Sequence, residues 1–109
     1  MTAIKLELKK GPITTAITVA AALYSYKGGV LDETLCANES YRLDHSVVII
    51  GYGMDCATGN EYWIMKNSWG KAWGENGFFR LKIAPGPSGY GICLAHYYLI
   101  TANLPWTDL

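Results

Sequence analysis

The sequence predicts a mainly β fold, an antiparallel barrel-like domain with one short helical segment. Three observations support this prediction: short runs of β-branched and aromatic residues, apolar residues at alternate positions, and turn residues at close intervals. The chain has 109 residues, so we expect a single domain over residues 1–109. Half of the residues are hydrophobic and 17% are charged, a balance typical of folded domains.

Each expected element follows from a local pattern. A period of two or a cluster of β-branched residues indicates a strand, and Gly or Pro indicates its end. In chain order we expect strands over 1–10 and 13–19, a helical turn over 20–26, a loop over 36–43, strands over 45–52, 61–66 and 78–83, and a last strand over 92–100.

Two of these elements carry further expectations. Residues 1–10 place Ile4, Leu6 and Leu8 at alternate positions, which favours a strand, although a frayed helix is the alternative. The run 47–50 is continuously apolar, so we expect the strand over 45–52 to be buried on both faces.

Charge and composition exclude several classes of function. Lys plus Arg and Asp plus Glu each number 9, so nothing favours nucleic acid or an acidic membrane as a partner. The mostly apolar run 13–24 loosely imitates a signal peptide, but Glu7 and Gly11-Pro12 interrupt the pattern and we assign the run to the fold. The three cysteines form no CxxC pattern and the two histidines lie far apart, so we expect neither a metal nor a cofactor.

A first candidate for chemistry is His45, which stands where a polar loop enters an apolar strand. A general base needs such a combination of rigid backbone and accessible ring. On this stretch alone, the simpler interpretation of a surface histidine at a strand end is favoured.

A second candidate is Asn67, in the stretch Tyr62-Trp63-Ile64-Met65-Lys66-Asn67-Ser68-Trp69-Gly70-Lys71-Ala72-Trp73-Gly74-Glu75-Asn76-Gly77-Phe78. Its amide oxygen is suited to accept a hydrogen bond from a histidine N–H, and Trp69 to shield that bond from water. A turn whose tryptophans pack the core is the simpler interpretation.

Together the two stretches resemble the papain-like cysteine proteases. The family's histidine motif is an Asp-His pair followed by an apolar strand ending in Gly-Tyr-Gly, here Asp44-His45 and Gly51-Tyr52-Gly53. The tryptophan-rich stretch around Asn67 matches the family's asparagine motif at nearly every fixed position. The resemblance covers roughly residues 9 to 104 and implies the second, β-rich domain of the two-domain α+β fold.

The resemblance implies roles for individual residues. His45 would be the base that pairs with a cysteine thiolate, and Asn67 would orient its ring. Trp69 would cover the bond between them. Further cleft residues implied by the resemblance are Leu43 and Asp44 in the substrate wall, Trp73 on the leaving-group side and Tyr98 near the floor of the specificity pocket. For Tyr98, a core aromatic of the last strand is the alternative.

The family's cysteine positions imply a disulfide between Cys36 and Cys93, with Cys56 left as a free surface thiol or paired with an absent partner. A disulfide would indicate a lysosome-like vesicle or the extracellular space. Members of the family commonly have glycine at the position of Leu94, so this chain departs from the family there.

Two functions remain open from the sequence. The family's Cys-Gly-Ser-Cys-Trp segment and its oxyanion glutamine are absent, so the chain would be the C-terminal portion of a thiol endopeptidase. Its partners would be a peptide or protein substrate and an N-terminal, Cys-bearing domain or chain, and we expect no activity from the chain alone. The alternative is a non-catalytic truncated chain or peptide-binding module.

Overall fold

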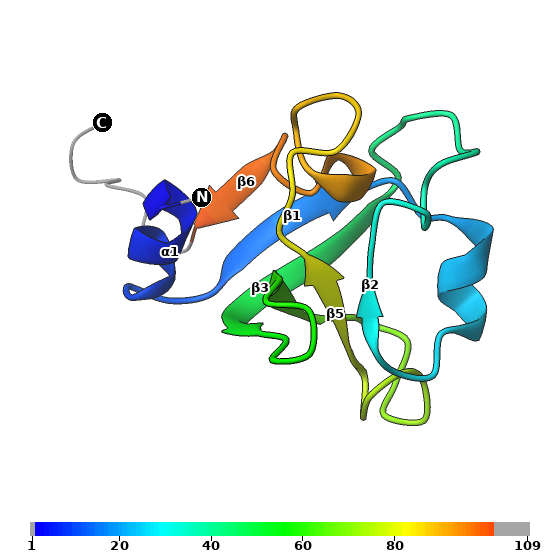
Figure 1. The fold of residues 1–109 in the computed structure, drawn as a ribbon, viewed down its shortest axis with the longest axis horizontal. Helices are drawn as coiled ribbons and strands as arrows, with labels where there is room; N and C mark the ends of the chain where they lie inside the picture. The colour runs from blue at the N-terminus through cyan, green and yellow to red at the C-terminus, as the bar shows by residue number, and fades with distance from the viewer. Residues whose placement is uncertain (1, 102–109) are drawn as a thin grey trace.

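The computed structural model describes residues 2–101. A short helix precedes a six-stranded sheet, and two short 3-10 helices interrupt the order of strands (Figure 1). The elements are α1 (Thr2–Leu8), β1 (Ile13–Ile17), η1 (Ala21–Ser25), β2 (Val30–Leu31), β3 (His45–Met54), β4 (Glu61–Lys66), β5 (Phe78–Lys82), η2 (Ile92–Leu94) and β6 (Leu99–Thr101).

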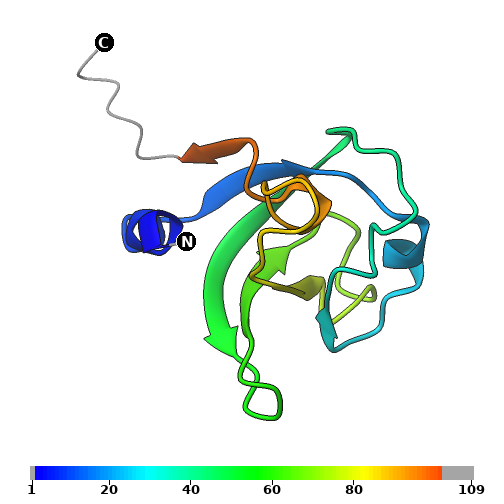
Figure 2. The same ribbon diagram turned by 45° about the horizontal axis from the view of Figure 1, so that its top comes forward.

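The sheet has the order β2-β5-β4-β3-β1-β6. All neighbours are antiparallel except β2 and β5, which pair in parallel over two residues. Figure 2 shows the strong curvature of the long strand β3, with α1 beside one edge of the sheet. The mainly β prediction is therefore confirmed, but β2 and β6 remain edge strands, so closure into a barrel is not confirmed.

Residues Thr2–Leu8 form a helix rather than the favoured strand, as the alternative anticipated. Ile4 is buried and Leu8 packs against the same core, a spacing of four that places both on one helical face. Leu6, the third member of the alternating pattern, is 54% exposed. The period of two was thus coincidental.

The expectation that β3 is buried on both faces is wrong. Val47 and Ile49 lie in the core, whereas Ile50 is 46% exposed and Val48 is half-buried. One face of β3 packs on the core, as in an ordinary antiparallel sheet, and the described residues leave the other face partly uncovered.

The strand expected over 92–100 is largely wrong. Cys93 and Leu94 adopt positive φ angles of 57° and 63°, which no strand allows, and only Leu99–Thr101 pairs with β1. The positive φ at Leu94 gives a physical reason for the glycine that the family commonly has there.

The core lies on the concave side of the sheet. Thr15 and Thr18 are buried with their hydroxyls hydrogen-bonded to backbone groups. The largest fully buried apolar side chains are Trp63, Phe79, Ile13, Ile17, Leu23, Ile49, Met65, Leu81 and Ile92. This core fixes β3 and β4, whose ends carry the two residues singled out by the sequence.

Candidate active site

His45 and Asn67 meet at one end of the central strand pair. His45 begins β3 and Asn67 directly follows β4, and the antiparallel register pairs Val48 with Lys66. The start of one strand thus lies beside the end of the other. His45 Nε2 lies 2.7 Å from Asn67 Oδ1, a hydrogen-bonding distance.

The hydrogen bonds of Asn67 indicate which ring nitrogen of His45 carries the proton. The Ser68 backbone N–H donates to Asn67 Oδ1 at 2.8 Å, so this atom is an acceptor. His45 Nε2 must therefore donate to the same oxygen, and a neutral ring then carries no proton on Nδ1. The geometry leaves Nδ1 of His45 as the basic atom.

The Asn67 side chain is held rigidly. The residue is 5% exposed, and its backbone N–H donates to the Gly77 carbonyl at 3.0 Å. Its Nδ2 is buried without an acceptor in the described part of the chain. Such burial strengthens the bond to His45, since little water competes for the amide oxygen.

Aromatic rings surround the pair. Trp69 stacks on the His45 ring with centroids 5.0 Å apart, and Tyr24 of η1 stacks on Trp69 at 4.7 Å and 8°. Trp73 supports Trp69 from the edge at 5.1 Å and donates through Nε1 to the Leu23 carbonyl. Trp69 therefore covers one face of the His45 ring, while Trp73 packs behind Trp69 against the core.

A surface pocket of about 310 Å³ opens beside His45. Asp44, His45 and Trp69, all anticipated from the sequence, line it. Further lining residues that the sequence did not indicate are Val19, Ala21, Tyr24, Glu39 and Arg42. These residues belong to no recognisable sequence motif. Their place beside His45 is therefore visible only in the folded structure.

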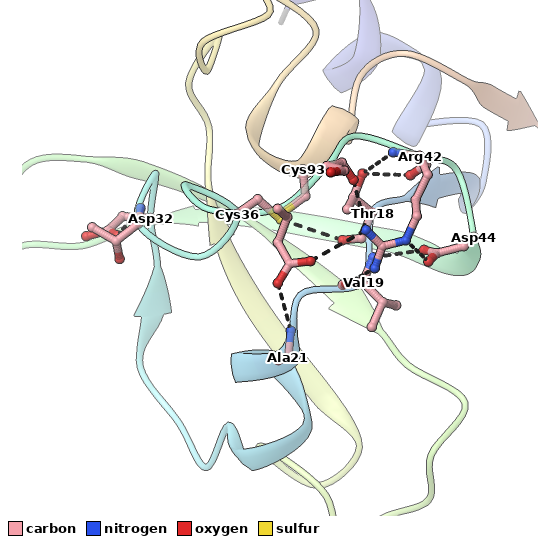
Figure 3. The surroundings of a disulfide bond; sticks show 11 residues. Thr18, Val19, Ala21, Asp32, Cys36, Arg42, Asp44 and Cys93 are labelled. Atoms are coloured by element: carbon pink, nitrogen blue, oxygen red, sulfur yellow. Dashed lines mark hydrogen bonds and ion pairs between the residues drawn. A yellow bond between two sulfur atoms is a disulfide. The ribbon is translucent and has the colours of Figure 1, made fainter.

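Asp44 is fixed as an anion at the edge of this pocket. Its Oδ1 accepts the Val19 backbone N–H at 2.9 Å, and its Oδ2 pairs with Arg42 (Figure 3). The hydrogen bond from Val19, followed by the Arg42 guanidinium, holds the pKa of Asp44 below its usual range.

The remaining predicted cleft residues lie outside this pocket. Leu43 is 40% exposed in the loop before His45. Tyr98 is 51% exposed, so the alternative of a core aromatic is wrong. Its carbonyl accepts from Ala16 N, and Ala16 pairs with Ser46 of β3, one residue from His45.

The predicted disulfide joins Cys36 and Cys93, with the sulfurs 2.03 Å apart and the Cα atoms 5.6 Å apart (Figure 3). It adjoins Thr18, whose N–H donates to the Cys93 carbonyl at 2.9 Å. The next residue, Val19, holds Asp44, so the disulfide anchors the segment beside the pocket. Cys56 is an exposed free thiol.

Within residues 2–101, no three His, Cys, Asp or Glu side chains gather in an arrangement suited to a metal ion. The same part of the chain contains no helix long and apolar enough to cross a bilayer.

These features place His45, Asn67 and Trp69 together beside one surface pocket. Residues 1–99 match the model of the papain family cysteine proteases, and the chain belongs to that family. It is 34% identical over 85 residues to "Cysteine proteinase 3" of Solanum lycopersicum, covering 78% of this chain and 23% of that protein.

Solved structures show the same fold. The bromelain protease of Ananas comosus, in complex with the E64 inhibitor, matches 87% of this chain and 41% of its own, with a TM-score of 0.73 and 38% identity. The digestive procathepsin L2 of Tenebrio molitor larval midgut matches with a TM-score of 0.69 and 32% identity, covering 86% of this chain and 28% of its own. This chain thus spans less than half of each relative.

Proposed function

We propose that this chain supplies the base and the orienting amide of a papain-like thiol endopeptidase. The observation that carries the proposal is the 2.7 Å bond between His45 Nε2 and Asn67 Oδ1, which leaves Nδ1 of His45 as the basic atom. The nucleophilic cysteine and the oxyanion glutamine would come from an N-terminal domain or chain.

The reaction would use each atom in turn. His45 Nδ1 takes the proton of the partner's cysteine, forming a thiolate and an imidazolium. The thiolate attacks the peptide carbonyl, and the imidazolium returns its proton to the leaving amine as the C–N bond breaks. Water then hydrolyses the thioester, with His45 again as the base. Asn67 keeps the ring oriented throughout, as the third member of a triad does.

The chain's own cysteines are poorly placed for this role. Cys36 and Cys93 are bonded to each other. Cys56 lies two residues beyond the end of β3, whereas His45 is the first residue of that strand, so the whole length of β3 separates them. The pocket of Tyr24, Asp44 and Trp69 beside His45 would accept the substrate segment on the leaving-group side. The disulfide supports an oxidising compartment, such as a lysosome-like vesicle or the extracellular space.

A chimera tests the proposal, with residues 11–101 of this chain replacing the matching part of the bromelain protease. We expect hydrolysis of a fluorogenic peptide and covalent labelling by E64. His45→Ala in the chimera should lower kcat/KM by about 10²–10⁴-fold, the usual contribution of a general base. The matched control is His96→Gln, which changes the other histidine.

The isolated chain should not hydrolyse the fluorogenic peptide. Its labelling by E64 should be no faster than that of an ordinary exposed thiol, because Cys56 is the thiol that can react. Turnover by the isolated chain would show that our account of the nucleophile is wrong. Full activity of a folded His45→Ala chimera would show that the assignment of the base is wrong.

A further inference from the structure

The loop between Cys36 and Arg42 contains a motif that the proposed function does not use. Asn38, Glu39 and Ser40 form an Asn-x-Ser triplet whose middle residue is not proline. Such a triplet is the acceptor for N-linked carbohydrate in secreted proteins. Of the five asparagines in the sequence, Asn38 alone is followed two residues later by serine or threonine. The sequence therefore offers a single acceptor.

The structure places this acceptor in an exposed turn. The Glu39 backbone N–H donates to the Cys36 carbonyl at 3.2 Å, which closes a turn with Asn38 at its third position. Asn38 and Ser40 are both exposed. The two residues that define the motif are thus on the protein surface, where a bulky polar group can be attached.

The middle residue of the triplet is held against the body of the protein. Glu39 is half-buried and lines the pocket beside His45. Its carboxylate accepts the Ala21 backbone N–H at 3.3 Å and pairs with Arg42 at 3.5 Å. Because Glu39 makes these contacts while its two neighbours are exposed, a carbohydrate on Asn38 can extend into solvent without displacing them.

The same loop carries a second mark of the secretory pathway. Cys36 lies two residues before Asn38 and is bonded to Cys93. Disulfides form in the oxidising lumen of the endoplasmic reticulum and persist in secreted proteins, the class in which an Asn-x-Ser triplet is an acceptor. The disulfide and the triplet therefore indicate the same compartment by independent chemistry.

We propose that Asn38 is a site of N-linked glycosylation. Its Nδ2 forms a bond to the anomeric carbon of an oligosaccharide that is carried on a polyprenyl pyrophosphate. The bond from that carbon to the pyrophosphate oxygen breaks, the polyprenyl pyrophosphate leaves with the electron pair, and Nδ2 loses one proton. The secretory pathway supplies the donor and its transferase, and Ser40 completes the motif. The inference goes beyond the proposed function and does not depend on it.

Expression of the full chain behind a cleavable secretion signal in cultured human cells tests the inference. We expect a band that migrates slowly in SDS gel electrophoresis and that peptide:N-glycosidase F converts to a faster one. When this digestion is done in 18O water, mass spectrometry of the tryptic peptide 28–42 should find Asn38 converted to 18O-labelled aspartate. Cell lysate and medium are both analysed, so that poor secretion does not hide the modification.

Three variants assign the carbohydrate to this triplet. Asn38→Gln removes the acceptor and Ser40→Ala removes the hydroxyl, and both should give only the faster band, with or without the glycosidase. Ser40→Thr is the matched control, because it keeps the motif and should keep the slower band. Both positions are exposed, so the substitutions should change stability little. Detection of the Cys36–Cys93 linkage in non-reduced peptides shows that each variant has folded.

An unmodified Asn38 in the unsubstituted chain would overturn the inference. A slower band that persists in Asn38→Gln would overturn it as well, because the carbohydrate would then be attached elsewhere. Neither result bears on His45 and Asn67, which the chimera assay tests separately.

Discussion

Removal of the Cys36–Cys93 disulfide should cost this domain a large part of its stability. The bond closes a loop with a sequence separation of 57 residues. Chain-entropy reasoning assigns about 4 kcal/mol to a cross-link of that length, because the unfolded chain loses conformational freedom. Small domains have a total free energy of unfolding of about 5–15 kcal/mol, so the loss is substantial.

The measurement is urea denaturation of the double variant Cys36→Ala/Cys93→Ala, followed by circular dichroism. With an m-value of about 2 kcal/mol per molar urea, the midpoint should fall by about 2 M. The effect should reach the active site as well, because Thr18 contacts both cysteines and precedes Val19, which holds Asp44. Amide resonances of Val19 and Asp44 should therefore broaden or shift in the variant.

Cys56→Ala is the matched control, since this thiol is exposed and unpaired. It should change stability by less than about 0.5 kcal/mol. A double variant that loses less than about 1 kcal/mol would refute the reasoning that the cross-link acts by restricting the unfolded chain.

Three further predictions concern the domain outside the catalytic pair. Leu94→Gly should stabilise the fold by about 1 kcal/mol in thermal or urea denaturation, because Leu94 has a φ angle of 63°, which is strained for leucine and relaxed for glycine. Destabilisation would show that the packing of the Leu94 side chain outweighs the strain. His96 accepts the Trp63 indole N–H at 2.7 Å, and burial lowers its pKa to about 4. Its folded pKa lies below the unfolded value of about 6.5, so stability should fall as pH drops from 6.5 toward 4, and a folded His96→Gln variant should show a shallower slope. Glu75→Gln should lower the free energy of unfolding by about 1–2 kcal/mol, because Glu75 accepts two hydrogen bonds from Arg80 at 2.9 and 2.7 Å. Glu33→Gln, which removes an exposed ion pair with Lys82, should lower it by less than about 0.5 kcal/mol. Equal losses for the two variants would contradict this ranking.

The sequence predicted the central strands well because each had a clear pattern between turn residues. Strands β3, β4 and β5 begin at the expected residues His45, Glu61 and Phe78. The first helix was harder, since Ile4, Leu6 and Leu8 fit a strand and only tertiary packing selects the pair Ile4 and Leu8. The last strand was over-extended because nothing in the composition of residues 92–100 reports the positive φ angles at Cys93 and Leu94.

The candidate site was predictable where a motif existed. His45, Asn67, Trp69 and the disulfide followed from the family resemblance, and the structure places the first three together. Tyr24 was not predictable, because its stacking on Trp69 depends on how η1 folds over a loop distant in sequence. A second pocket, lined by residues that include Lys66, Asn67 and Phe78, was equally hidden, since it depends on which strands pair beside Lys66.

The apolar run in β3 led to an over-prediction of its burial. The continuous apolar run 47–50 indicated burial on both faces, yet the described residues cover only one.

The central claim, that Asn67 fixes His45 with a free Nδ1, has a direct test in this chain. The measurement is a long-range 1H–15N correlation spectrum of the histidine rings at about pH 8.5, about two units above the pKa of free histidine. We predict that the proton of His45 resides on Nε2 and that Asn67→Ala reduces this preference. A proton on Nδ1 of His45 in the unmodified chain would contradict the account, because the ring would then present no base to a cysteine.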